Sequence, residues 1–391
     1  MMSDPRANPA YRPVVQPLAR RPANRSAIKI IAGIIAILAA VLLGLLVLLL
    51  IGVETGPVGL MIGLVSATLP VPIYLLLVLW IDRYEGEPYW MLATAFFWGA
   101  LVAVFFAFVL NTASAIAVAL MSGDANAGEA FGAVVSAPIV EESAKALILF
   151  IFFFWKKDEF DGVIDGIVYA AMVGLGFAMT ENIQYYGRAV QEGGGETLQF
   201  VFILRGFLAP FSHPLFTAMT GIGLGLARQS SNAAIKFLTP LVGLATAISL
   251  HAIWNGSAVL FGGPGFLITY IFLMVPAFFI MFVVIALALR REGQIIREHL
   301  TPDLHGGLLT QREYEQLGTI RGRMGSAYTA FSRGGFGHWQ ACRQLNQMAS
   351  ELAFHRSRVG RGIRAHDAHE REAEYRQALA ELLARLRASG R

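Results

Sequence analysis

The sequence predicts an all-α, polytopic membrane protein, a helical bundle with about eight transmembrane helices and a cytoplasmic helical tail. Hydrophobic residues make up 55% of the 391 residues, charged residues make up only 15%, and the mean hydropathy is +0.56. Soluble domains are less apolar and more highly charged. The apolar residues form runs of about 20 or more, the length that crosses a bilayer as a helix. Helices are expected because they satisfy every backbone polar group within their own segment.

Three regions follow one another along the chain. Residues 1–29 contain six Lys and Arg among prolines and small polar residues, which predicts a disordered basic cytoplasmic leader ahead of an uncleaved first span. Residues 30–290 form the predicted transmembrane core. Its candidate spans are 30–51, 57–81, 88–121, 131–155, 162–187, 199–228, 235–261 and 264–290.

Residues 291–391 form an Arg-rich tail in which an apolar stripe recurs at helical spacing. The stripe consists of Tyr375, Leu379, Leu382 and Leu386. A small cytoplasmic helical hairpin is the main expectation, and a helix that binds the membrane surface or a partner is the alternative.

The distribution of basic residues predicts the orientation of the chain. The loops 82–88, 155–162 and 228–236 hold most of the loop Lys and Arg, whereas the loops around Glu54 and Asp124 are poor in them. Because basic loops stay in the cytoplasm, both termini are expected there. The basic ends also suit the anionic surface of a lipid bilayer, so the net charge of +4 does not indicate binding to nucleic acid.

Ionisable and amide side chains inside four predicted spans indicate a functional site. They are Glu141, Glu142 and Lys145 in one span, Glu181 and Asn182 in the next, then His213, and finally His251 and Asn255. A charge at the hydrocarbon centre costs about 2.5–3.5 kcal/mol on insertion scales, so such residues are read as parts of a site. At about 1.5 Å of rise per residue, all four positions are expected roughly 9–21 Å below the outer surface. They can therefore share one cavity.

Each of these groups, taken alone, also has a structural interpretation. The charged trio can be an ion pair that joins helices, and Glu141 and Lys145 have the favourable i, i+4 order. The amides can form interhelical hydrogen bonds, and His213 can mark a helix break. One shared site explains the set more simply, because only two of the eight histidines lie in spans and both fall at the depth of the glutamates.

Carboxylates, imidazoles and an amide at one buried point suit hydrolysis of a peptide bond. A carboxylate can activate water, and imidazole or amide donors can stabilise the oxyanion. No serine nucleophile elbow or HExxH motif competes for this role, and the only cysteine, Cys342, lies in the tail outside the predicted spans. Two histidines and one carboxylate also form a catalytic zinc set. The candidate metal ligands are Glu181, His213 and His251.

The four motifs, in this order on four spans, resemble those of the PrsW family of intramembrane proteases. They are Glu141-Glu142-Ser-Ala-Lys145, Phe177-Ala-Met-Thr-Glu181-Asn182, His213-Pro-Leu-Phe216 and His251-Ala-Ile-Trp254-Asn255. The resemblance covers about residues 57–290, and the family is similar to the CAAX prenyl endopeptidase and bacteriocin-processing superfamily.

By position, the resemblance implies Glu141 as the base and Glu142 with Lys145 as its tuning partner. It implies His251 with Asn255 as the oxyanion-binding pair. Glu181 stands where the superfamily usually has a histidine, and His213 is implied to complete the base or a metal shell.

The resemblance implies a protease of the bacterial inner membrane. Its expected substrate is a single-span membrane protein, such as an anti-sigma factor, cut in or near its transmembrane segment. PrsW proteases are classed as metallopeptidases and the CAAX relatives as metal-independent glutamate enzymes, so zinc-assisted and metal-free mechanisms both stay open. Two other classes stay as alternatives: a proton-coupled transporter, and a catalytically inactive scaffold that binds membrane proteins.

Overall fold

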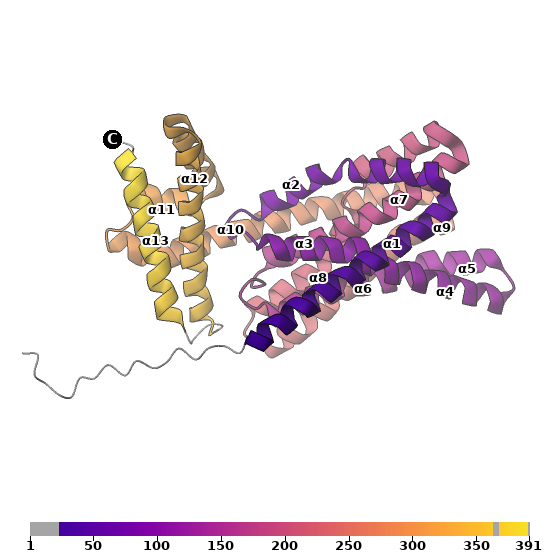
Figure 1. The fold of residues 1–391 in the computed structure, drawn as a ribbon, viewed down its shortest axis with the longest axis horizontal. Coiled ribbons are helices and arrows are strands. Elements are labelled where there is room, and N and C mark those ends of the chain that lie inside the picture. Colours follow the sequence, from indigo (N-terminus) through magenta and orange to yellow (C-terminus); the bar gives the residue numbers. More distant parts are fainter. Residues whose placement is uncertain (1–22, 363–366, 390–391) are drawn as a thin grey trace, which may run out of the picture. The chain divides into compact units, whose positions relative to one another are not determined.

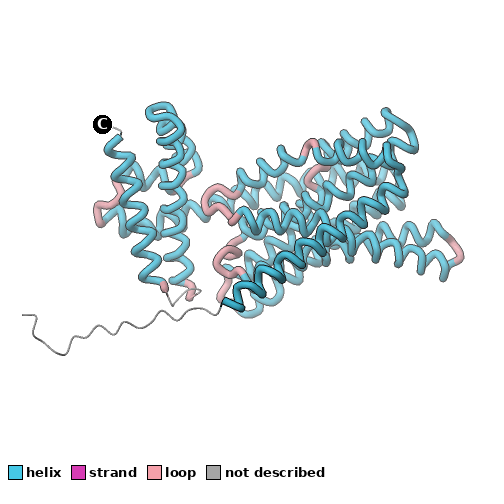
Figure 2. The backbone as a smooth tube through the Cα atoms, in the orientation of Figure 1, coloured by secondary structure: helices cyan, strands magenta, loops and turns pink. Residues whose placement is uncertain are grey.

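The computed structural model describes residues 23–362 and 367–389, and within these ranges the chain is helical without any strand (Figures 1 and 2). The predicted all-α class is therefore confirmed. Residues 1–22 of the predicted leader lie outside the described residues, and the first helix already begins at Ala23. The chain forms two compact units, residues 1–42 and 43–391.

The first unit contains the beginning of α1 (Ala23–Thr68). From Ile30 to Leu42 nearly every side chain is apolar and exposed, which suits a helix in contact with lipid. The rest of α1 belongs to the second unit and bends at Gly56 and Pro57. Gly56 has a φ of 66°, a conformation that glycine adopts without strain.

The second unit continues through twelve further α-helices and four π-helical turns of the described residues. In order they are α2 (Val71–Ile81), α3 (Tyr89–Phe97), η1 (Trp98–Ala103), α4 (Val104–Ser122), α5 (Ala125–Phe131), η2 (Gly132–Ser136), α6 (Ala137–Trp155), α7 (Val163–Ile203), η3 (Leu204–Leu208), α8 (Ser212–Gln229), α9 (Ala233–Thr269), η4 (Tyr270–Met274), α10 (Val275–His305), α11 (Gln311–Leu317), α12 (Ile320–Gly360) and α13 (Ala368–Ser389).

All eight predicted spans fall on helical residues, but two of them are interrupted. The span 57–81 breaks between Thr68 and Val71, and the span 199–228 breaks after Leu208, before α8 begins. Among the described residues, four helical stretches are long and apolar enough to cross a membrane: Ile30–Ile81, Tyr89–Ser122, Val163–Gln229 and Ala233–His305. Several of these contain more than one predicted span, so the number of crossings stays a prediction.

Helix α7 forms the centre of the bundle, since every residue from Ile164 to Ala178 is buried. A helix that is apolar on all sides is typical of this position. Glycines allow its close packing against α8: a Cβ on Gly166 would lie 2.1 Å from the carbonyl oxygen of Gly221. A Cβ on Gly174 would lie 2.6 Å from the nitrogen of Pro214. Small residues thus let the backbones of α7 and α8 approach each other closely.

The tail folds as helices that pack on one another. Helix α12 reverses direction at Gly334 and Gly335, which have non-helical dihedral angles, and its second arm packs against α13 (Figure 1). Leu379 is fully buried and Leu382 is partly buried, as the apolar stripe predicts. Helix α10 passes residue 290 without a break, so one continuous helix joins the predicted core to the predicted tail.

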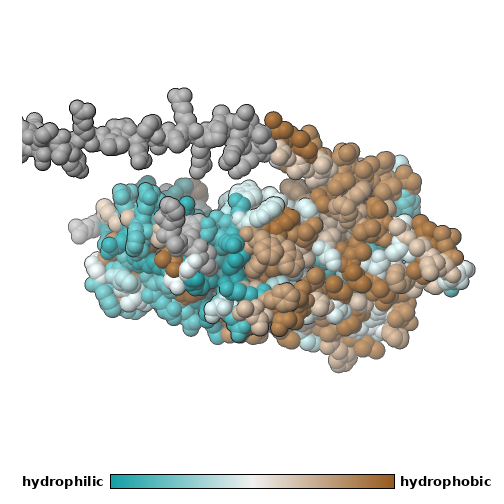
Figure 3. Space-filling view, turned by 90° about the horizontal axis from the view of Figure 1, so that it is seen from below, coloured by the Kyte–Doolittle hydropathy of each residue, from teal (hydrophilic) through white to brown (hydrophobic). Residues whose placement is uncertain are grey.

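The tail contacts two of the loops that the distribution of basic residues assigns to the cytoplasm. Arg358 on α12 lies 2.7 Å from Glu85 and 3.4 Å from Asp161, and Arg361 lies 3.0 Å from Asp161. The loops 82–88 and 155–162 therefore lie on the same side of the bundle as the tail. Figure 3 shows hydrophilic surface over the tail and mainly apolar surface over the core.

Candidate active site

Helix α6 carries three charged side chains that point into the bundle. Glu141, Glu142 and Lys145 are 5%, 1% and 0% exposed. By contrast, Ile139 and Leu147 on the same helix are 48% and 51% exposed. The charges thus share the protein-facing side of α6, and the apolar residues face outward, as the high energy of a charge in lipid requires.

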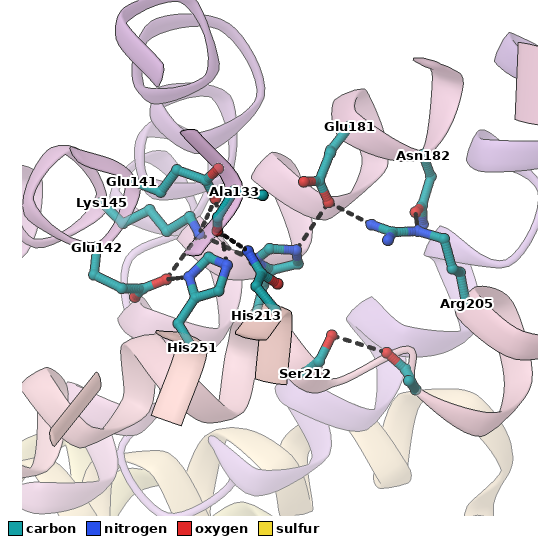
Figure 4. A network of polar contacts seen from close by, with 12 residues as sticks. Ala133, Glu141, Glu142, Lys145, Glu181, Asn182, Arg205, Ser212, His213 and His251 are labelled. Carbon is teal, nitrogen blue, oxygen red and sulfur yellow. Dashed lines mark hydrogen bonds and ion pairs between the residues drawn. The ribbon is translucent and has the colours of Figure 1, made fainter. Parts of the chain in front are cut away.

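The ammonium group of Lys145 lies at the centre of the cluster in Figure 4. Its Nζ is 2.9 Å from Oε1 of Glu142, 3.3 Å from Oε2 of Glu141 and 3.0 Å from Nδ1 of His213. It also lies 3.7 Å from the centre of the Phe177 ring, a cation–π contact. Because an ammonium can only donate, Nδ1 of His213 accepts this bond, and the proton of the neutral ring is on Nε2.

Glu142 is held by three donors. Its Oε1 accepts from Lys145 and lies 3.0 Å from Nδ1 of His251, and its Oε2 accepts from the hydroxyl of Thr217 at 2.9 Å. Both oxygens are occupied and the side chain is 0% exposed. Glu142 therefore fixes Lys145 and His251. Since Nδ1 of His251 donates to the carboxylate, the lone pair on Nε2 of the neutral ring stays available.

Glu141, unlike Glu142, faces a cavity. Its Oε1 accepts a 3.4 Å hydrogen bond from Nδ2 of Asn111, and Oδ1 of Asn111 accepts from Ser136 at 2.8 Å. Its Oε2 lies 3.9 Å from Nε2 of His251. This separation is too long for a direct hydrogen bond, and one oxygen atom placed between the two groups can contact both.

Glu181 on α7 joins the cluster through His213. Its Oε2 lies 2.9 Å from Nε2 of His213 and also pairs with the guanidinium of Arg205. Nε of Arg205 donates to Oδ1 of Asn182 at 2.5 Å, and the guanidinium lies 3.8 Å from the centre of the Tyr185 ring. Arg205 thus holds Glu181 in the orientation that contacts the imidazole.

The structure brings six of the eight predicted site residues into one contiguous network. They are Glu141, Glu142, Lys145, Glu181, His213 and His251. The two amides lie beside this network. Asn182 contacts Arg205, and Asn255 donates to the carbonyl of Ala133 in η2 at 3.0 Å.

Sequence reasoning missed three residues that contact the network: Arg205, Asn111 and Thr217. Arg205 and Asn111 were detectable, because each is a polar residue inside a predicted span, the same signal that identified the glutamates. Thr217 follows His213 by four residues and therefore shares its helix face. A hydroxyl is too common in membrane helices to stand out alone.

The cavity beside Glu141 has a volume of about 380 Å³. It lies between α1, α4 and α7, and its polar lining includes Asn111, Glu141 and Glu181. Glu54 and Arg188, which form an ion pair, also line it, and Gln184 donates to Glu54 at 2.7 Å. The cavity thus connects two carboxylates of the network, Glu141 and Glu181, to the polar side chains of Glu54, Gln184 and Arg188 on α1 and α7.

Three residues of the network can hold a metal ion. One ligand atom from each of Glu141, His213 and His251 lies within 4.8 Å of the other two. Two imidazoles and a carboxylate form a catalytic zinc set. The contact between His251 and Glu142 is of the kind that orients a metal-bound histidine. The donor set therefore fits a divalent ion such as zinc.

This set of three candidate metal ligands differs from the set expected from sequence in one member, because it contains Glu141 in place of Glu181. Glu181 instead contacts the imidazole of His213 from outside the set. The ammonium of Lys145 contacts both Glu141 and His213. A metal ion and the charged lysine would compete for the same lone pairs.

A helical membrane bundle that buries carboxylates, imidazoles and a lysine next to a cavity has the groups that an intramembrane hydrolytic enzyme needs. The comparisons with known proteins make this specific. The chain belongs to the PrsW family of intramembrane metalloproteases, because the family model matches residues 87–284, about half of the chain. The resemblance to the PrsW family is thereby confirmed, and the protein is a peptidase of the PrsW type.

Relatives of known name agree with this assignment. The chain is 36% identical over 172 residues to Protease PrsW of Geobacillus kaustophilus, covering 43% of this chain and 68% of the relative. It is 31% identical over 195 residues to Protease PrsW of Oceanobacillus iheyensis, covering 50% and 82%. It is 33% identical over 181 residues to Protease PrsW of Bacillus subtilis, covering 46% and 76%. No solved structure matches the chain significantly.

Proposed function

We propose that the protein hydrolyses a peptide bond in or near the transmembrane segment of a single-span membrane protein, with Glu141 as the general base. The observation that carries this proposal is the asymmetry of the carboxylate pair. Glu141 lines the cavity, while both oxygens of Glu142 are occupied by donors from within the protein. Of the two, only Glu141 can therefore accept a proton from a water molecule in the cavity.

In this mechanism, water bound between Glu141 and His251 loses a proton to Oε2 of Glu141 as its oxygen attacks the carbonyl carbon of the scissile bond. Nδ2 of Asn111 is a donor beside the same carboxylate and can stabilise the oxyanion. The proton on Glu141 then passes to the departing amine. Lys145 offsets the negative charge of Glu142, which keeps His251 oriented.

The proposal includes a metal-assisted form, in which Glu141, His213 and His251 would hold a divalent ion. A bound zinc ion supplies Lewis-acid activation of water and of the carbonyl group. Metal analysis of the active purified enzyme, together with a chelator test, separates this form from the carboxylate-only form.

We also propose that the protein is a multi-pass protein of the bacterial inner membrane, with both termini in the cytoplasm. The basic loops that contact the tail support this orientation. An anti-sigma factor is the substrate that the resemblance implies. The rival classes make different predictions: a proton-coupled transporter predicts uptake driven by a pH gradient, and an inactive scaffold predicts binding without cleavage.

The test measures cleavage of a single-span substrate by the purified enzyme in lipid vesicles. Glu141→Gln keeps the size of the side chain and removes the base, so the rate is expected to fall by about 10²-fold or more. Glu129→Gln is the matched control, because Glu129 is exposed and lies outside the cavity and the network. Cleavage by Glu141→Gln at the parental rate would refute the proposed base.

A further inference from the structure

A second cavity shares no lining residue with the carboxylate network and lies where the core meets the tail. Its volume is about 570 Å³, and it forms a groove between the end of α2, helix α10 and the start of α12. Its lining comprises Trp80, Tyr84, Phe282, Ile285, Ala286, Leu289, Arg290, Gly293, Gln294, Arg297, Gly318, Thr319 and Ile320. Neither the family match nor the peptidase assignment gives this groove a role.

The groove is apolar along one half and cationic along the other. Along α10, the residues from Phe282 to Leu289 are apolar, and charged residues begin at Arg290. From Phe282 to Arg297 the groove follows α10 for about 22 Å, using the rise per helical residue. Trp80, 51% exposed, forms part of its opposite wall. Tryptophan is enriched at the boundary between hydrocarbon and headgroups, so this change in polarity marks the depth of that boundary.

The cations at the polar end are only partly neutralised. Arg290 is exposed and has no hydrogen bond or ion pair with the residues that the structure describes. Arg297 donates to the carbonyl of Gly318 at 2.9 Å, and Arg83 lies 4.0 Å from the centre of the Trp80 ring. The acidic neighbour Glu292 interacts with Tyr84 and Arg323 on the inner side of α10. A ligand in the groove would therefore meet net positive charge.

We propose that this groove binds an anionic phospholipid, with an acyl chain along Phe282, Ile285 and Leu289 and the phosphate at Arg290. The division of the groove into an apolar and a cationic half matches the two parts of such a lipid. An anionic headgroup also complements the cations better than a zwitterionic one, because a basic residue at the membrane surface attracts anionic lipid by about 1 kcal/mol. The site is independent of the proposed catalytic mechanism.

The test is native mass spectrometry of the purified full-length protein, titrated with phosphatidylglycerol or phosphatidylcholine. The parent protein should retain phosphatidylglycerol preferentially, and Arg290→Gln should weaken that binding about fivefold. Arg291→Gln is the matched control, since Arg291 is also exposed and unpaired among the described residues but does not line the groove. It should bind the lipid like the parent.

A second pair of variants tests the apolar half. Ala286→Trp fills the groove and should remove the tightest lipid, whereas Leu287→Trp, on a neighbouring exposed residue outside the groove, should not. Retained cleavage of the test substrate by all four variants would show that they fold. Equal binding of both lipids by the parent, or unchanged phosphatidylglycerol binding by Arg290→Gln, would overturn the proposal. The proposal would also be overturned if the parent formed dimers that dissociate in Ala286→Trp, because a second copy of the chain would then occupy the groove.

Discussion

At the scale of single residues, two adjacent glutamates have different environments. Glu142 binds a lysine, a histidine and a threonine, whereas Glu141 binds Lys145 and Asn111 at longer distances and faces the cavity. The sequence predicts that both glutamates belong to a site, because charged residues inside an apolar run are costly in the membrane. It cannot tell which member faces the cavity, since that depends on which helices pack on each side of α6.

Arg205 is expected to position the network without touching the substrate. Its guanidinium binds Glu181 and Asn182 together, and Glu181 in turn orients the imidazole of His213. We predict that Arg205→Gln lowers the cleavage rate about 10–100-fold, the usual range for residues that orient a catalytic or metal-binding group. The measurement is the cleavage rate of the single-span substrate in vesicles.

Arg205→Lys is the informative companion variant. Lysine keeps the charge but lacks the planar fork that contacts two acceptors at once, so only partial recovery of the rate is expected. Equal rates for the parent and Arg205→Gln would show that Glu181 does not depend on this contact. Thermal unfolding of each variant separates a local effect from loss of the fold.

At the scale of elements, hydropathy predicts where helices lie but not where they break. The interruption between Thr68 and Val71, and the one between Leu208 and Ser212, lie inside apolar runs that read as continuous. Four π-helical turns add residues within the described helices and change which side chains face inward. For this reason, the contact of Asn255 with η2 was not predictable from its i, i+4 spacing to His251.

Arg358, whose side chain is 4% exposed, is one of the residues through which the tail contacts the core. It pairs with Glu85 and Asp161 and donates to the carbonyl of Asp158 at 3.1 Å. Burial raises the pKa of Glu85 well above its usual value, and Arg358 opposes that shift. Breaking a buried ion pair by removing one partner costs about 3–5 kcal/mol, so Arg358→Ala should release the tail.

Hydrogen exchange in α12 and α13 measures this release directly. We expect much faster exchange in Arg358→Ala than in the parent. Arg361→Ala is the matched comparison, because the Arg361 side chain is 28% exposed and its loss should have a smaller effect. Equal protection of the tail in both variants and the parent would show that apolar packing alone holds it in place.

At the scale of the whole molecule, the family match and the tail are separate parts of the chain. The match ends at residue 284, and the helices from α11 onward lie beyond it. The carboxylate network comes from α6, α7, α8 and α9 inside the match, whereas α1, which helps to line the cavity beside Glu141, lies before it. The motifs could therefore predict the network, but the cavity became visible only when helices distant in sequence were placed together.

The cavity between α1, α4 and α7 is the expected route by which substrate reaches Glu141. Thr112 is exposed and lines the cavity without contacting the network, so Thr112→Trp should obstruct entry and leave the chemical step intact. Because such a change removes binding rather than transition-state stabilisation, KM should rise about tenfold while kcat changes little. Ile116→Trp, on a lipid-exposed position of the same helix outside the cavity, should behave like the parent. If Thr112→Trp also leaves KM unchanged, the substrate approaches Glu141 from another side of the bundle.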